Sequence, residues 1–433
     1  MGLIVEKQLK KPKFRARTVR KERMTPYQGE GAVVSHLLHF RSENGALVCG
    51  EGKEEVAQII KGADLYRASG RTFFYKGEFL YEHVAGGVRL IDRIRALKTI
   101  VSTFDEEGNE TPYAVCEEQI FSIGELSVKE VSSSRGGVCA AWHYDRLFTA
   151  RGYRLYYSAP MRANETEETL HGAGYVDLPE IGGDVFGLIP FKEKLYLFRE
   201  RCVTQLRVQG DVRNVKAINL PTAFGRIYRR TVANCGEKIL FVTENGLYSF
   251  GGAYCTRVEG SGISEISVDE ETNAAFCGSR YYLAGKNKHG ERTLLSVSVA
   301  DGSGYLIGER ARSVAAIEGE AYFTTDEGKL FRLTPFGLPT SGECVAEIGR
   351  TALGLSARRK YLDALLLEGH GYFRIIAEGE KDSVTVCGKA GETLYFPKPV
   401  RGTAFRLRIC TCDADCVLRA ITFSVREESA YGY

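Results

Sequence analysis

One unit recurs along this chain of 433 residues, and it restricts the possible fold more than any other feature of the sequence. Each copy has a run of β-forming residues, a short polar turn, a second run, and often a glycine-centred turn and a third run. The strands that begin near Ile239, Tyr281 and Ala321 lie about 40 residues apart, which is the length of one β-propeller blade. Because one small sheet cannot bury both of its faces, we expect the copies to stack around a common axis. The clearest copies are 139–157, 189–198, 232–250, 274–283 and 314–331.

Two earlier segments, 63–91 and 97–123, follow the same pattern. Hairpin turns are indicated at Asn245-Gly246 and at Glu327-Gly328, because glycine and asparagine tolerate the positive φ that such turns need. The total predicts a propeller of six or seven blades, since propellers have 4 to 8. The apolar run 32–40 is predicted to be a strand that either closes the ring or anchors the segment before it.

The repeat stops near 335–339, and the remaining sequence has a different rhythm of strands and short glycine-rich turns. Several antiparallel strands of this kind are typical of a β-sandwich. The sequence therefore predicts an all-β protein in which a six- or seven-bladed β-propeller is followed by a small C-terminal β-sandwich. The predicted parts are a basic N-terminal arm at 1–30, the propeller at 31–338, the sandwich at 339–426 and a tail at 427–433.

The N-terminal arm concentrates positive charge, although the net charge of the whole chain is only +3. Such a segment is either a solvated arm or one that docks on an acidic neighbour or on nucleic acid. We expect it to bind a partner and to be separable from the folded disc. Its basic residues are Lys7, Lys10, Lys11, Lys13, Arg15, Arg17, Arg20, Lys21 and Arg23.

The sequence carries no recognisable catalytic motif: it has no nucleophile elbow, no zinc-protease helix, no phosphate loop and no dinucleotide fingerprint. With no export signal recognised, the twelve cysteines are expected to be reduced thiols, and 410, 412 and 416 lack zinc-ligand spacing. We therefore predict no enzymatic activity, no metal, no cofactor and no membrane span. Acidic residues in blade turns keep a glycoside hydrolase open as an alternative: Asp92, Asp145, Glu200 and Asp326.

Two stretches of the middle region, 142–160 and 181–200, carry a family resemblance. In the first, a strand that opens at Asp145-Arg-Leu-Phe148 is followed by a glycine turn and Arg154-Leu-Tyr-Tyr-Ser158. This pattern resembles blades of bacteriophage β-propeller tail proteins, the tail-nozzle and packaged-DNA-stabilisation proteins of short-tailed phages. The segments 358–362 and 396–402 are also similar to β-domains appended to phage structural proteins.

The resemblance implies a structural virion protein, a subunit of a tail nozzle, hub or head–tail connector ring that extends the DNA channel and retains the genome. It implies a homo-hexameric ring in the virion, made in the bacterial host cytoplasm. The expected partners are neighbouring copies, portal, adaptor or other tail proteins, and passively DNA. Known nozzle proteins are generally longer than this chain. The alternatives are a non-catalytic binding propeller, either a scaffold or a receptor- or glycan-recognition protein, and a propeller glycoside hydrolase.

Overall fold

A computed structural model describes most of the chain, which divides into two compact units. One unit comprises Leu37–Arg41 and Gly50–Gly342, and the other comprises the chain before Leu37, Ser42–Cys49 and the chain from Glu343 onward. Within the described part, no helix is long and apolar enough to cross a membrane. The described ranges are 19–24, 34–85, 87–131, 135–169, 172–209, 211–220, 224–338, 342–353 and 359–427.

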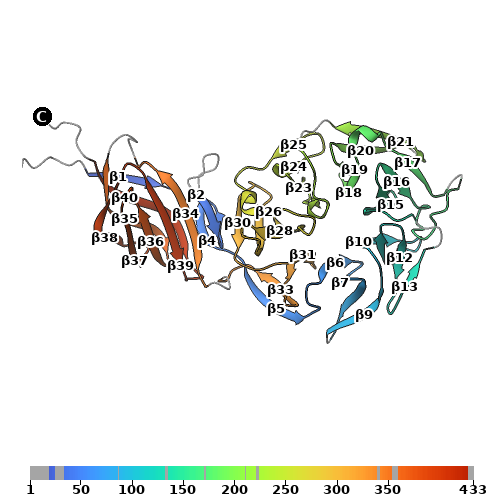
Figure 1. The fold of residues 1–433 in the computed structure, drawn as a ribbon, viewed down its shortest axis with the longest axis horizontal. Coiled ribbons are helices and arrows are strands. Elements are labelled where there is room, and N and C mark those ends of the chain that lie inside the picture. The colour runs from blue at the N-terminus through green and yellow to red at the C-terminus, as the bar shows by residue number, and fades with distance from the viewer. Residues whose placement is uncertain are drawn as a thin grey trace, which may run out of the picture. The chain divides into compact units, whose positions relative to one another are not determined.

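The larger unit is a seven-bladed β-propeller, which confirms the predicted fold class (Figure 1). Six blades are built from four antiparallel strands that follow one another along the chain. In five of them these strands form a separate four-stranded sheet, whereas those of the sixth belong to a larger sheet. The first blade consists of β6 (Asp64–Ala68), β7 (Arg71–Lys76), β8 (Phe79–Val84) and β9 (Gly87–Arg93). The second consists of β10 (Leu97–Phe104), β11 (Glu110–Cys116), β12 (Ile120–Ile123) and β13 (Val128–Glu130). The third consists of β14 (Cys139–His143), β15 (Arg146–Arg151), β16 (Arg154–Tyr157) and β17 (Gly174–Asp177). The fourth blade consists of β18 (Val185–Phe191), β19 (Lys194–Arg199), β20 (Val203–Gln209) and β21 (Asp211–Leu220). The fifth consists of β22 (Ala233–Asn234), β23 (Ile239–Thr243), β24 (Gly246–Phe250) and β25 (Cys255–Arg257). The sixth consists of β27 (Asn273–Cys277), β28 (Arg280–Asn287), β29 (Arg292–Ser298) and β30 (Gly304–Ile307).

The seventh blade closes the ring with a strand from the beginning of the propeller. Its strands are β31 (Ser313–Ile317), β32 (Glu320–Thr324), β33 (Lys329–Thr334) and β5 (Gly52–Gln58). In the antiparallel pair of β33 and β5, Arg332 faces Glu54, and their side chains form an ion pair of 2.6 Å. The ring is therefore held shut by hydrogen bonds and ion pairs between segments far apart in the sequence.

The closing strand is not the apolar run 32–40, as one of the predicted alternatives had it. That run is divided between β2 (Val34–Leu38) and β3 (Phe40–Glu43), because His39 between them has a positive φ of 59°. The actual closing strand β5 carries Lys53, Glu54 and Glu55, and its charged positions are largely solvent-exposed. This strand is difficult to predict from its polar sequence, because an outermost strand of a blade need not be apolar.

Apolar and aromatic side chains fill the spaces between the blades. The inner strands contact one another in cyclic order, and larger side chains pack behind them. Between the fourth and fifth blades, the ring of Phe198 lies 5.0 Å from that of Phe241 and 6.1 Å from that of Phe250. Between the fifth and sixth, the fully buried Tyr281 donates a hydrogen bond of 2.7 Å to the Thr231 carbonyl oxygen. The stacked sheets thus bury each other, as the repeat requires.

The smaller unit is a β-sandwich. Its two sheets pack apolar faces together, with Leu362 and Phe423 buried on one and Phe373 and Ile409 on the other. One sheet contains β4 (Ala46–Cys49), β40 (Val417–Glu427), β35 (Lys360–His370) and β38 (Thr393–Gly402), and β1 (Val19–Met24) pairs with β40. The other contains β34 (Cys344–Thr351), β39 (Phe405–Thr411), β36 (Tyr372–Glu378) and β37 (Ser383–Lys389).

The sandwich takes two segments that the sequence analysis placed elsewhere. Strand β1 falls within the predicted arm 1–30, yet Val19 to Met24 pair in register with Arg426 to Ile421 of β40. Strand β4 was assigned to the predicted propeller 31–338, but Ala46–Cys49 belong to the sandwich unit. A local pattern identifies a strand without identifying its partner, so these assignments were wrong. Residues 428–433 of the predicted tail lie outside the described residues.

Candidate anion-binding site in the propeller channel

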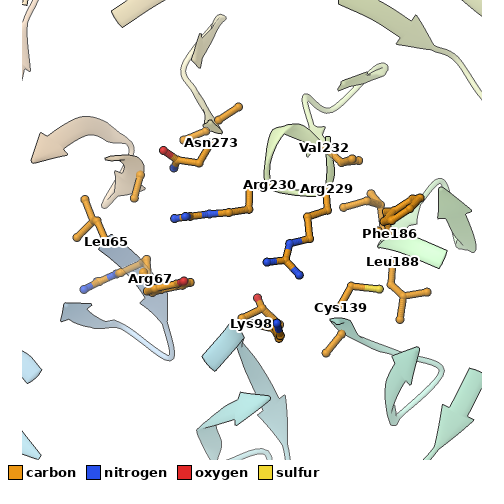
Figure 2. A pocket seen from close by; sticks show the side chains of 18 of the residues that line it. Leu65, Arg67, Lys98, Cys139, Phe186, Leu188, Arg229, Arg230, Val232 and Asn273 are labelled. Atoms are coloured by element: carbon orange, nitrogen blue, oxygen red, sulfur yellow. The ribbon is translucent and has the colours of Figure 1, made fainter. Parts of the chain in front are cut away.

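The seven blades enclose a cavity of about 320 Å³ at the propeller centre (Figure 2). Every blade contributes to its lining through its inner strand or through the segment just before that strand. Small residues keep the cavity open, among them Gly187 on β18, Ala274 on β27 and Ala315 on β31. Its size falls within the range of small-ligand pockets, which starts at about 300 Å³.

The lining of this channel cavity is basic. Figure 2 shows two arginines projecting side by side into the open space from η2 (Arg229–Thr231), the short 3-10 turn before β22. Among the described residues that line the cavity, none is aspartate or glutamate, whereas four are cationic. Low-dielectric walls with charge of a single sign create a favourable potential for an anion. The four cations are Arg67, Lys98, Arg229 and Arg230.

One of the four cations, Arg229, has no counterion among the described residues. No ion pair joins Arg229 to a carboxylate in the described part of the chain, and its buried Nε has no hydrogen-bond partner there. A buried guanidinium nitrogen without an acceptor is costly, so Arg229 favours an incoming oxyanion. The other three cations have carboxylate partners: Arg67 with Glu318 at 3.4 Å, Lys98 with Glu117 at 3.2 Å and Arg230 with Asp64 at 3.1 Å.

Arg230 is held in place by a charge network that crosses four blades. Asp64 on β6 accepts from Arg230 and also lies 3.4 Å from Nε of Arg312. The guanidinium of Arg230 lies 5.9 Å from the ring centroid of Tyr66. Because Arg230 is restrained, it supports the position of the neighbouring Arg229. The network continues through Arg312–Asp326, Asp326–Arg292, Arg292–Glu271, Glu271–Lys286 and Lys286–Asp269.

Two neutral groups complete the chemistry of the channel. Burial raises the pKa of Tyr66, although the nearby charge of Arg230 works in the opposite direction. Burial also raises the pKa of the Cys139 thiol to about 12, against the lowering effect of Arg229. At neutral pH Tyr66 can therefore donate a hydrogen bond, whereas Cys139 is not the thiolate that nucleophilic catalysis needs.

The basic residues predicted as a partner-binding arm are only partly described. Arg20, Lys21 and Arg23 lie in β1, and the Lys21 side chain is exposed. The remaining six lie outside the described residues: Lys7, Lys10, Lys11, Lys13, Arg15 and Arg17. The part of the arm that the structure describes is thus a strand of the sandwich.

The four acids of the glycosidase alternative are not brought together at the channel, since none of them lines the cavity. Asp92 accepts a hydrogen bond of 3.2 Å from the backbone of Val128, and Asp326 pairs with arginines. Asp145 lies in the turn between β14 and β15, and Glu200 follows β19. Each belongs to a different blade, and no hydrogen bond or ion pair among the described residues joins two of them.

The histidine, cysteine, aspartate and glutamate side chains of the described ranges form no metal-binding group. No three of them lie close enough together to hold a metal ion. Of the C-terminal cysteines, Cys410 and Cys416 are buried and Cys412 is exposed.

The two channel arginines are not among the sites predicted from the sequence. The feature that could have indicated them is a tandem pair of positive charges, Arg229-Arg230, directly before the first strand of a repeat copy. Lys98 gave a second signal, since it lies in the first strand of its copy, and the first strands of propeller blades line the channel.

Comparisons with known proteins find neither a protein-family model nor a curated protein sequence that matches the chain. Similar solved structures include BamB from Moraxella catarrhalis, with 10% identity over 74% of this chain and 98% of that chain and a TM-score of 0.40. PorZ of Porphyromonas gingivalis has 11% identity over 79% of this chain and 46% of that chain, with a TM-score of 0.44, so this chain spans less than half of PorZ. U3-55K has 8% identity over 66% of this chain and 98% of that chain, with a TM-score of 0.42. The fold assignment rests on the blade topology itself.

Proposed function

We propose that the protein is a non-catalytic binding propeller that holds an oxyanion of a partner molecule in its basic channel. The observation that carries this proposal is Arg229, a channel arginine that has no carboxylate partner among the described residues. The described lining around it has four cations and no acid. A carboxylate or phosphate group would accept charge-assisted hydrogen bonds from its guanidinium. Arginine is suited to such groups because its planar donors match two oxygens at once.

The neighbours of Arg229 support the same ligand chemistry. Arg230 adds a second positive charge from the same turn, and its pairing with Asp64 restrains it. Tyr66 also lines the cavity, and its neutral hydroxyl is a potential hydrogen-bond donor to the ligand. A cavity of about 320 Å³ suits a single anionic group or a narrow acidic segment rather than a folded domain.

Isothermal titration calorimetry tests the proposal, with pyrophosphate and citrate as the phosphate and carboxylate probes. Hydrogen bonds to a charged group contribute about 1.5–3 kcal/mol, so Arg229→Gln is expected to weaken binding by about tenfold or more. Binding should also weaken as salt is added. The matched control is Arg226→Gln, because Arg226 is exposed, pairs with Glu270 at 2.5 Å and lies outside the cavity lining.

The two variants distinguish a channel site from general surface charge. Equal affinity of the wild-type protein and Arg229→Gln would exclude Arg229 as the binding group. An equal loss in Arg226→Gln would assign the binding to surface charge, and no binding of either probe by the wild-type protein would also contradict the proposal.

The resemblance to phage tail proteins supports a second and finer proposal, a subunit of a tail ring. The segment 142–160 that carries the resemblance includes the end of β14 together with β15 and β16 of the third blade. Closed ring assembly requires a head-to-tail contact repeated around one axis. Light scattering after size-exclusion chromatography tests it: a mass of about six chains supports the ring, and a monomer at every concentration contradicts it.

A further inference from the structure

Two buried thiols meet in the core of the sandwich. The Sγ atoms of Cys49, at the end of β4, and Cys344, at the start of β34, are 3.4 Å apart. The two strands belong to opposite sheets, and Cys49 and Cys344 are 1% and 0% exposed. A disulfide has an S–S length of about 2.05 Å, so small side-chain rotations would bring the sulfurs within bonding distance.

A disulfide between these thiols would also affect the propeller, because of where the two cysteines lie in the sequence. The two cysteines are 295 residues apart, and the segment Gly50–Gly342, which contains the strands of all seven blades, lies between them. The ring itself is closed by the noncovalent pairing of β5 with β33. A disulfide between the two thiols would add a covalent link to this noncovalent closure of the ring.

We propose that Cys49 and Cys344 form a reversible disulfide that joins the two sheets of the sandwich and encloses the whole propeller in one covalent loop. A loop of this length restricts the unfolded chain strongly, which stabilises the folded state. The proposal concerns the sandwich thiols alone and does not depend on the anion site in the channel.

The oxidant is a low-molecular-weight disulfide such as oxidised glutathione. One cysteine loses its proton, and its thiolate attacks the S–S bond of the oxidant, which forms a mixed disulfide and releases one small thiol. The thiolate of the second cysteine then attacks the mixed disulfide, forms the Cys49–Cys344 bond and releases the second small thiol. Two protein thiols are oxidised and one small disulfide is reduced to two thiols, so electrons balance.

The environment of the thiols predicts slow formation at neutral pH. The hydrogen bond with Cys49 and burial both raise the pKa of the Cys344 thiol above its ordinary value. Because the thiolate is the attacking species, the reaction should accelerate as pH rises. A third buried thiol, Cys416, interacts with Cys49 and is the competing partner.

Mass spectrometry of the full-length native protein tests the proposal. The protein is incubated with oxidised glutathione at about pH 8.5, alkylated under denaturing conditions and digested. We expect a crosslinked peptide pair that contains Cys49 and Cys344. On a non-reducing denaturing gel, the oxidised chain should migrate faster, because a loop of 295 residues is closed. A single protease cut in the propeller should leave two fragments joined until dithiothreitol is added.

Variants provide the controls. Cys49→Ser and Cys344→Ser should abolish the mobility shift, whereas Cys235→Ser, at a buried thiol of the propeller, should retain it. The mapping on the wild-type protein decides the question even if a variant fails to fold. The proposal is overturned if the wild-type protein forms no crosslink with excess oxidant, or if Cys49 pairs with Cys416 instead.

Discussion

Glu82 offers a sharp test of what holds neighbouring blades together. This glutamate on β8 has a side chain only 8% exposed, and it accepts hydrogen bonds from Nε of Arg71 at 2.5 Å and from Nη2 of Arg89 at 2.7 Å. Arg71 in turn donates to the carbonyl oxygens of Ile123 at 3.2 Å and Gly124 at 2.9 Å in the second blade. Glu82 therefore orients the arginine that connects the first blade to the second.

We predict that Glu82→Gln lowers the free energy of unfolding of the propeller by about 2–3 kcal/mol. Breaking a fully buried ion pair costs about 3–5 kcal/mol. The value is reduced here because Arg71 and Arg89 are 22% and 38% exposed and regain some hydration. The matched control is Glu78→Gln in the same blade, since Glu78 is 40% exposed and pairs with the exposed Arg93. Exposed pairs contribute about 0–1 kcal/mol.

The contribution of Glu82 should depend on pH. Burial alone would raise its pKa, but the hydrogen bonds from Arg71 and Arg89 outweigh burial and hold the pKa below its ordinary value. A carboxylate with a lowered pKa stabilises the fold above its unfolded pKa of about 4.3, and this contribution is lost as pH falls through the lower folded value. The difference between the wild-type protein and Glu82→Gln should therefore be largest at neutral pH and shrink in acid.

Urea unfolding followed by the fluorescence of Trp142 measures this difference. Trp142 is the only tryptophan of the chain and lies in β14, so its signal reports on the propeller. The midpoints are compared at pH 7 and at about pH 3.5. Equal losses in Glu82→Gln and Glu78→Gln at neutral pH would refute the reasoning, as would a Glu82→Gln deficit that persists undiminished in acid.

Two further predictions follow from the packing and the strand pairing. Tyr281→Phe should destabilise the propeller by about 1–3 kcal/mol, because the buried Thr231 carbonyl loses its 2.7 Å hydrogen bond, and urea midpoints read by Trp142 check this. An unchanged midpoint would contradict that role. Deletion of residues 1–24 should leave the propeller folded but expose the edge of β40, so that amides of 421–426 exchange faster in hydrogen-exchange mass spectrometry. Unaltered exchange there would mean that β1 does not protect this edge.

Most strands of the blades could be predicted from the sequence, because each lies next to its partner along the chain. Arg146–Arg151 and Ile239–Thr243 are short runs of β-forming residues bounded by turn residues, and each pairs with the strands immediately before and after it. Strand β38 is difficult to predict from the sequence, because Pro397 and Pro399 argue against a strand. Its place at the edge of a sheet explains why the prolines are tolerated.

The sequence by itself determined the local hairpins, the repeat and therefore the propeller class, since these depend on residues within about 40 positions of one another. The tertiary structure decided which distant segments complete each sheet. Gly52–Gln58 closes the seventh blade and Val19–Met24 joins the sandwich, in each case through backbone pairing with residues hundreds of positions away. It also decided the site: Arg230 and Asp64 are 166 residues apart, and closure of the ring brings them together at the channel beside Arg229. The repeat in the sequence reflects strand pairing between residues that are close along the chain. Contacts between charged residues that are distant in the sequence depend instead on how the blades close around the propeller axis.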